Sequence, residues 1–155
     1  MKRRRLFIYI TSLLIIFLIF FYLGYTDFAL FRKKETFTIY NGYASLFVTH
    51  KIEVFSDLSL KNKLQNIADS LSRIVFYNLP VKVVSIDTVE NKTVATINLL
   101  DYDSRFTDEK NRYNGWKDMH LENPVYEKCT GESISYSFAQ PKYKGQWIDG
   151  FKILY

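Results

Sequence analysis

The side chains best suited to chemistry in this chain are two histidines and one cysteine. Imidazole and thiolate groups act as bases, nucleophiles and metal ligands. His120 and Cys129 would form a reactive thiol if the fold brought them together, whereas His50 has no second metal-binding side chain near it in sequence. Two histidines and one cysteine cannot build a usual zinc site without several carboxylates. Signatures of nucleophilic, phosphate-binding and zinc-dependent catalysis are also missing. We therefore predict no catalytic residue, no metal, no cofactor and no enzymatic activity.

Carboxylates in residues 101–123 are the other candidates for chemistry. A carboxylate-rich loop can bind Ca²⁺, but this segment lacks the central glycine and the closing glutamate of the EF-hand spacing. Asp118 and Glu122 form a pair that could act as acid and base in glycan hydrolysis. The same residues also fit a solvated loop, so hydrolysis in the cell envelope is the weakest functional alternative.

The charge of the chain is divided unevenly. The net charge is +5, but residues 1–34 hold seven of the 21 basic residues and only Asp27 of the 16 acidic ones. Residues 35–155 therefore carry 14 basic (21 − 7) and 15 acidic (16 − 1) residues, which gives a charge near −1. This balance excludes nucleic-acid binding by bulk electrostatics. The single cysteine cannot form an internal disulfide, so the domain depends on its hydrophobic core.

An uncharged, almost wholly apolar run extends from Leu6 to Tyr25 and follows the basic residues Lys2 to Arg5. A helix of about 20 residues covers the roughly 30 Å hydrocarbon core of a membrane. The run is longer than the apolar part of a secretory signal and lacks a small-x-small cleavage site. We therefore predict an uncleaved single-pass anchor in the cell membrane. The basic residues before it place the N-terminus in the cytoplasm and residues 35–155 outside.

Hydrophobic periodicity indicates the elements that follow the anchor. Asn41-Gly42 between β-forming residues predicts a hairpin turn with positive φ at both positions, and a flexible tether is the alternative. Thr130 or Ser133 is expected to cap a short helix that ends at Pro141, although alternation within 134–138 fits a strand equally well. The remaining predicted elements are strands over 46–55, 81–88, 93–99 and 151–155, and a helix over 58–77 that Pro80 ends.

These elements predict an α+β fold: an N-terminal transmembrane helix, then a small sheet with two helices on one face. The predicted organisation is a cytoplasmic tail at 1–5, the anchor at 6–25, a stalk with a hairpin at 26–45, and an extracytoplasmic domain at 46–155.

Several short motifs occur in a particular order between residues 50 and 155. Residues 51–57 read KIEVFSD, residues 93–101 read TVATINLLD, and the helix before that strand ends at Pro80. Downstream, Thr130 precedes FAQP at 138–141 and YKGQWIDGF at 143–151. Together these motifs resemble the GerMN domain family of spore germination and sporulation proteins. The family has glycine where this chain has Leu79, and residues 101–123 have no counterpart that we can align.

The resemblance implies an extracytoplasmic interaction domain without an established active site. GerMN domains are similar to ring-building motifs, which associate side by side in sporulation channels and secretion rings. We therefore expect a scaffold that binds copies of itself or other envelope proteins of a Gram-positive cell, in sporulation, germination or envelope assembly.

Two groups of residues are the candidate sites. The polar face of the 58–77 helix is the candidate partner surface. The alternative is that this face simply contacts solvent. It consists of Lys61, Lys63, Asn66, Asp69, Ser70 and Arg73. The second group is motif-like and either shapes the core or lines a groove. It consists of Gln140, Tyr143, Trp147 and Asp149. As an alternative function, a peptidoglycan-binding module would stack sugars on aromatic rings. Its rings would be those of Tyr126, Tyr136, Tyr143 and Trp147.

Overall fold

The structure, a computed structural model, describes residues 2–30, 32–43, 48–101 and 115–155, without the side chains of 2–8, 23, 25–30, 118 and 119. The chain divides into two compact units, residues 1–33 and residues 34–155. Each unit is treated by itself below.

The first unit contains one helix, α1 (Lys2–Leu30). Its described side chains run without interruption from Tyr9 to Tyr22, and the large apolar ones among them are exposed. Across the described residues, no helix combines the length and the apolar character that crossing a membrane requires. This finding corrects the transmembrane helix of the predicted fold class.

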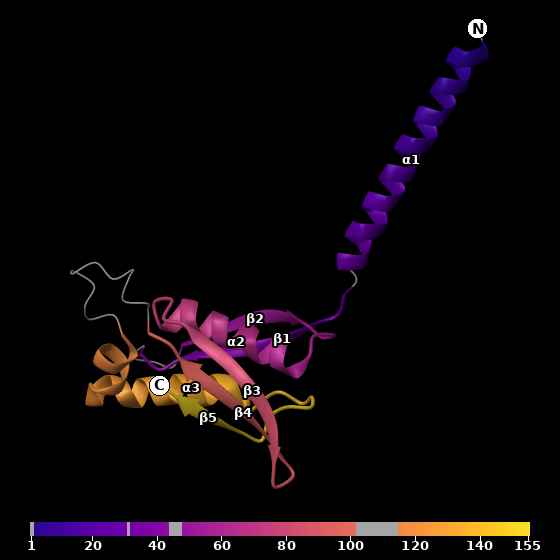
Figure 1. The fold of residues 1–155 in the computed structure, drawn as a ribbon. Coiled ribbons are helices and arrows are strands. Elements are labelled where there is room, and N and C mark those ends of the chain that lie inside the picture. The colour runs from indigo at the N-terminus through magenta and orange to yellow at the C-terminus, as the bar shows by residue number, and fades with distance from the viewer. Residues whose placement is uncertain (1, 31, 44–47, 102–114) are drawn as a thin grey trace. The chain divides into compact units, whose positions relative to one another are not determined.

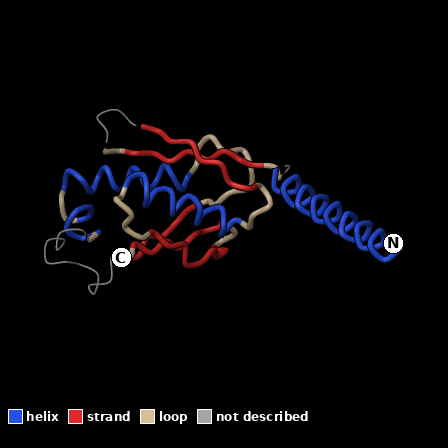
Figure 2. The backbone as a smooth tube through the Cα atoms, turned by 90° about the horizontal axis from the view of Figure 1, so that it is seen from above, coloured by secondary structure: helices blue, strands red, loops and turns tan. Residues whose placement is uncertain are grey.

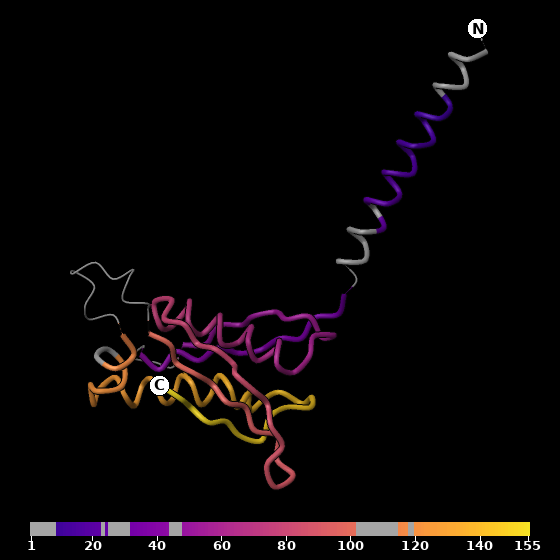
Figure 3. Tube along the Cα trace, viewed as in Figure 1, coloured from indigo at the N-terminus to yellow at the C-terminus, as the bar shows by residue number. Residues whose placement is uncertain are grey.

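The second unit is an α+β domain with two sheets (Figure 1). In β1–β2 the strands are antiparallel; in β3–β4–β5, β3 and β4 are antiparallel while β4 and β5 are parallel. Figure 3 shows β5, at the yellow end of the chain, lying beside the salmon-coloured β4. The elements are β1 (Lys34–Asn41), β2 (Val48–Phe55), α2 (Leu60–Val75), β3 (Val81–Val89), β4 (Lys92–Leu99), the π-helix η3 (Lys117–Leu121), α3 (Pro124–Ala139) and β5 (Gly150–Leu154).

Helices α2 and α3 form a layer between the two sheets (Figure 2). The predicted single sheet with two helices on one face is therefore corrected to a sheet on each side of the helices. The cause lies on α2, where small residues such as Ser70 and Ser72 are buried together with the apolar residues. Small side chains let a strand approach a second side of the helix, and the apolar spacing alone does not show this.

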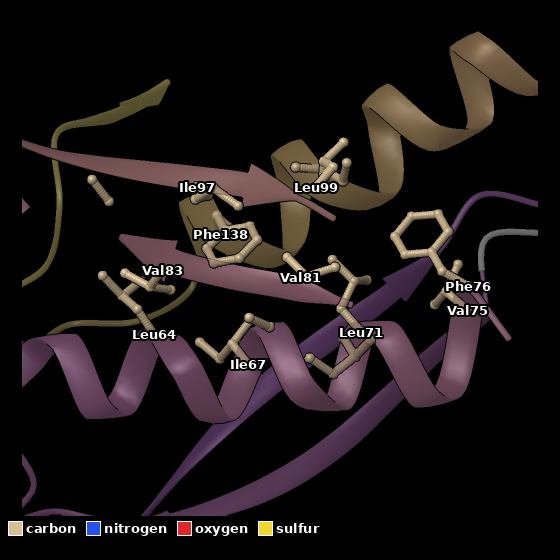
Figure 4. Packing of buried hydrophobic residues seen from close by; sticks show 14 of the residues in the cluster. Leu64, Ile67, Leu71, Val75, Phe76, Val81, Val83, Ile97, Leu99 and Phe138 are labelled. Atoms are coloured by element: carbon tan, nitrogen blue, oxygen red, sulfur yellow. The ribbon is translucent and has the colours of Figure 1, made fainter. Parts of the chain in front are cut away.

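The core is built where α2 meets the three-stranded sheet (Figure 4). Leu64, Ile67 and Leu71 of α2 are fully buried against strands β3 and β4 and against Phe138 of α3. Helix α2 begins after Ser59, whose side chain accepts a hydrogen bond from Asn62 N.

The turn between β3 and β4 has the conformation that a two-residue hairpin requires. Glu90 and Asn91 both have positive φ, 51° and 62°. Two positive φ angles fit the right-handed twist of the paired strands. The hairpin that the sequence predicted here is therefore confirmed.

The predicted turn at Asn41-Gly42 is wrong. Neither residue has a positive φ, and β1 connects to β2 through residues 42–47, of which 44–47 lie outside the described residues. Gly42 is instead required by close packing, because a Cβ atom there would lie 2.9 Å from the carbonyl oxygen of Cys129 in α3. Strand β1 also occupies residues assigned to the stalk, and it buries Phe37 and Ile39.

Helix α3 begins earlier than the sequence indicated. Its N-cap is Asn123, which accepts a hydrogen bond from Val125 N, and Pro124 occupies the first helical position. The predicted caps Thr130 and Ser133 lie within the helix and are buried. Pro124 opens the helix because its missing N–H would be unpaired there anyway.

Candidate functional site

The motif residue Gln140 closes the outer edge of β1. Its Oε1 accepts a hydrogen bond from Thr38 N at 3.0 Å, and its Nε2 donates to Thr38 O at 2.7 Å. The amide therefore replaces the backbone of a neighbouring strand. Gln140 ends α3 in the left-handed conformation (φ 44°) and is 5% exposed. Its geometry is that of a structural residue rather than of a ligand-binding one.

Two serines of α3 extend this closure along β1. Ser137 Oγ accepts a hydrogen bond from Tyr40 N, and Ser133 Oγ accepts one from Gly42 N, both at 2.9 Å. With Gln140, they satisfy every second amide of the edge. Sequence reasoning missed this polar stripe, because buried serines at helical spacing look like a solvent-facing surface.

The motif residues Tyr143 and Trp147 pack on Phe37 of β1. Their ring centroids lie 5.0 Å and 5.1 Å from that of Phe37. The Trp147 Nε1 donates a hydrogen bond to Phe138 O at 2.6 Å. These contacts join the segment after α3 to β1, and they use the ring faces that a bound sugar would need.

Tyr143 also belongs to a polar network with β1 and α2. Its hydroxyl donates to Glu35 Oε2 at 3.0 Å, and Lys63 Nζ contacts the same oxygen at 2.6 Å. Burial, and then the hydrogen bond to Glu35, raise the pKa of Tyr143 above its usual value. The Lys63 side chain is only 12% exposed, so this lysine of the predicted partner surface is occupied inside the domain.

The last motif residue, Asp149, fixes the start of β5. Its Oδ2 accepts a hydrogen bond from Thr93 N at 2.7 Å, and its own N–H donates to Thr93 O at 2.8 Å. Asp149 is exposed but its carboxylate serves this strand junction. Three of the motif residues, Gln140, Tyr143 and Trp147, therefore contact β1, whereas Asp149 joins β5 to β4.

The predicted partner surface on α2 is divided in the structure. Ser70 is buried, and Lys61 Nζ donates a hydrogen bond to Val84 O at 2.7 Å. Asn66, Asp69 and Arg73 are exposed. Lys63 and Ser70 of the predicted face are therefore taken up inside the domain, whereas its other four residues, Lys61 included, stay exposed.

A buried polar cluster forms a site that the sequence analysis did not identify. Tyr43 OH lies 2.6 Å from His120 Nδ1 and also hydrogen-bonds Thr130 Oγ1. His120 is 3% exposed, and the rings of Phe76 and Trp116 pack against it. The cluster joins positions 77 residues apart in the chain, and no local spacing could have indicated it. The sequence instead considered His120 with Cys129.

Counting protons in this cluster assigns the histidine tautomer. Thr130 Oγ1 donates its proton to His120 O at 3.1 Å, so it accepts from Tyr43 OH. Tyr43 has then used its only proton, and His120 Nδ1 must donate to the Tyr43 oxygen. His120 Nε2 therefore carries a lone pair, and no described residue partners it. Burial lowers the pKa of His120, which keeps the ring neutral.

The buried cluster predicts a distinct alkaline titration. Burial raises the pKa of Tyr43 from 10.0 to about 12. Between these two pH values the unfolded chain binds fewer protons than the folded chain, so the free energy of unfolding falls as pH rises through this range. We expect Tyr43→Phe to remove the highest-pH component of the ultraviolet tyrosinate titration. The exposed Tyr155→Phe is the control, and persistence of that component in Tyr43→Phe would contradict the assignment.

A cleft of about 460 Å³ adjoins the cluster through Thr130. Its charged lining residues are Glu127 and Lys128, and most of the other lining side chains are apolar. The lining residues are Leu99, Leu121, Pro124, Glu127, Lys128, Thr130, Gly131, Ile134, Ile153 and Tyr155. The cleft is therefore suited to apolar contact.

Cys129 and Glu122 are the other described candidates for chemistry. Cys129 is a free thiol of intermediate exposure. Glu122 is exposed and pairs with Lys117 at 3.3 Å, while the side chain of Asp118 lies outside the described residues. In the described part of the chain, no three histidine, cysteine, aspartate or glutamate residues are grouped to hold a metal ion.

Comparisons with known proteins add no assignment. No family model, no curated protein and no solved structure matches the chain.

Proposed function

We propose that residues 34–155 form a non-enzymatic interaction domain that assembles with further copies of the chain through open strand edges. The observation that carries this proposal is that side chains cover some strand edges and leave others open. Side chains of α3 close β1, and side chains of α2 hydrogen-bond the backbone of β3. In the described structure, β2 pairs only with β1, and β5 pairs only with β4.

The hydrogen-bond pattern identifies which backbone groups face outward on β2. The amides of Thr38 and Tyr40 point to α3, so Phe37 and Ile39 exchange hydrogen bonds with β2. Phe37 pairs with Ile52. The backbone of Lys51 therefore faces away from β1 and is free to pair with another strand.

The same reasoning applies to β5. Ala95 and Ile97 of β4 face β5, and the parallel register places Ala95 opposite Phe151. Phe151 and Ile153 then direct their backbone groups away from β4. An edge of β5 that meets an edge of β2 is a heterologous contact, which produces a ring when the rotation closes and a filament when it does not.

The sequence resemblance supports the same proposal. GerMN-like domains are expected to associate side by side, and we propose that this chain does so in a cell envelope, in sporulation or in germination. A glycan-binding role has less support, because Tyr143 and Trp147 pack on Phe37. Tyr126 and Tyr136 contact other neighbours, so the four rings do not gather on one surface.

Proline at an outward-facing edge position tests the proposal. Lys51→Pro removes one outward amide without removing a hydrogen bond to β1. We expect residues 34–155 to form concentration-dependent oligomers in analytical ultracentrifugation and Lys51→Pro to abolish them. Lys51→Ala, which keeps the amide, should assemble normally. A strictly monomeric wild-type domain, or equal assembly of the two variants, would rule out this edge as the contact.

A further inference from the structure

A second binding surface lies between α2 and the outer edge of β3. It is a groove of about 1060 Å³, the size of a generous ligand site. Its lining combines polar side chains of α2 with apolar side chains of β3 and includes no part of β2 or β5. The lining residues are Lys61, Asn62, Gln65, Asp69, Ser72, Asn78, Pro80, Val81, Lys82, Val83, Val84, Asn98 and Leu100.

Gln65 occupies the position of an added strand in this groove. Its Oε1 accepts a hydrogen bond from Val83 N at 2.8 Å, and its Nε2 donates to Val81 O at 3.1 Å. These are the N–H and C=O groups that an incoming strand would pair with. The side-chain amide is thus a substitute for a peptide backbone.

The Gln65 closure differs from the closure of β1 by Gln140. Gln140 is 5% exposed, and two serines continue its contact along the strand. Gln65 is partly exposed, and its Nε2 also donates to the exposed Asp69 at 2.7 Å. Asp69 lies one helical turn away and can hold the amide when it leaves β3. The Gln65 contact is therefore displaceable, whereas the Gln140 contact is part of the interior.

The backbone irregularity of β3 lies beside the same groove. The pairing with β4 shifts register between Val83 and Ser85, so Val84 bulges from the ladder. Its carbonyl accepts a hydrogen bond from Lys61 Nζ at 2.7 Å. Bulges re-aim backbone groups at an edge, and here the bulge adds one more acceptor to the groove wall.

The charge of the groove lining indicates which kind of peptide the groove prefers. Lys61 and Lys82 contribute two positive charges, and Asp69 contributes one negative charge. Both lysines are exposed, so they are available to a partner. A chain with carboxylates complements this balance, and a basic chain does not.

We infer that this groove binds an extended acidic peptide segment of a partner protein, which adds to β3 as a strand and displaces the Gln65 amide. Main-chain hydrogen bonds to Val81 and Val83 would supply affinity, and the two lysines would supply preference for carboxylates. The inference does not depend on self-assembly, because it uses β3 and leaves β2 and β5 untouched.

Selection of peptides on the full chain tests the inference. The probe is a phage library of random decapeptides, selected against the purified full-length protein. We expect enrichment of acidic peptides that slow hydrogen exchange of residues 81–84 when bound. Enrichment of basic peptides, absence of any enrichment, or protection confined to other strands would each overturn the proposal.

Two sets of variants sharpen this test. Lys61→Glu with Lys82→Glu should weaken binding of the selected peptides by about tenfold or more. Lys142→Glu with Lys144→Glu changes the net charge equally at exposed positions outside the groove and should leave binding unchanged. Gln65→Ala should tighten binding, because it removes the competing amide. Weaker or unchanged binding in Gln65→Ala would contradict displacement of the Gln65 amide. Equal weakening by both lysine pairs would show that the charge effect is not specific to the groove.

Discussion

Replacing Phe37 with alanine is expected to lower the free energy of unfolding of residues 34–155 by about 3–5 kcal/mol. Phe37 is fully buried in β1. Tyr143 and Trp147, from the segment between α3 and β5, pack on its ring. Removing the ring would leave a cavity where β1 meets this segment, and the two aromatic side chains cannot collapse into it without moving their own hydrogen bonds. The loss of unfolding free energy should therefore lie at the upper end of the range for core substitutions.

Urea denaturation measures this effect. Thr36→Ala, at an exposed position of the same strand, is the matched control and should change the free energy of unfolding by less than about 0.5 kcal/mol. The comparison also decides whether β1 belongs to the domain. A Phe37→Ala loss as small as that of the control would mean that β1 is dispensable, as a stalk would be.

The part of the fold that the sequence predicted well is governed by side-chain periodicity. Leu64, Ile67 and Leu71 recur at the spacing of a helix face, and they are fully buried in α2. The β3–β4 hairpin was predicted from two alternating runs around a polar connector. Its strands pair from Val81 opposite Leu99 to Val89 opposite Lys92. In both cases neighbouring positions carry enough information to fix the local structure.

The prediction of the fold was incomplete where helix α3 covers the edge of strand β1. Phe37 and Ile39 were predicted as part of a hairpin within a stalk, and the sequence did not indicate that they belong to the core of the domain. Their burial depends on α3, whose serines look solvent-exposed until the amides of β1 are placed beside them. The sequence analysis missed the buried cluster of Tyr43 and His120 for the same reason. Such contacts join a backbone edge or a distant side chain to a helix, and a pattern of apolar residues along the chain does not encode them.

Gln140→Leu is expected to destabilise residues 34–155 by about 2–4 kcal/mol. Leucine has nearly the same size, so packing is largely retained, but the N–H and C=O of Thr38 both lose their partner. An unpaired group that water cannot reach costs about 1–3 kcal/mol. The amide of Gln140 also donates to Ser137 O at 2.6 Å, and this hydrogen bond would be lost too.

Gln146→Leu is the matched control, because it makes the same chemical change at an exposed position of the next loop. It should leave the free energy of unfolding within about 0.5 kcal/mol of the wild-type value. Gln140→Glu provides a finer test, since it keeps an acceptor for Thr38 N but sets a carboxylate oxygen against Thr38 O. It should destabilise the domain at neutral pH and recover at acidic pH, where a protonated carboxyl group can donate to Thr38 O. Equal urea midpoints for Gln140→Leu and Gln146→Leu would show that solvent already satisfies the edge of β1, and the distinction between closed and open strand edges would then lose its physical basis.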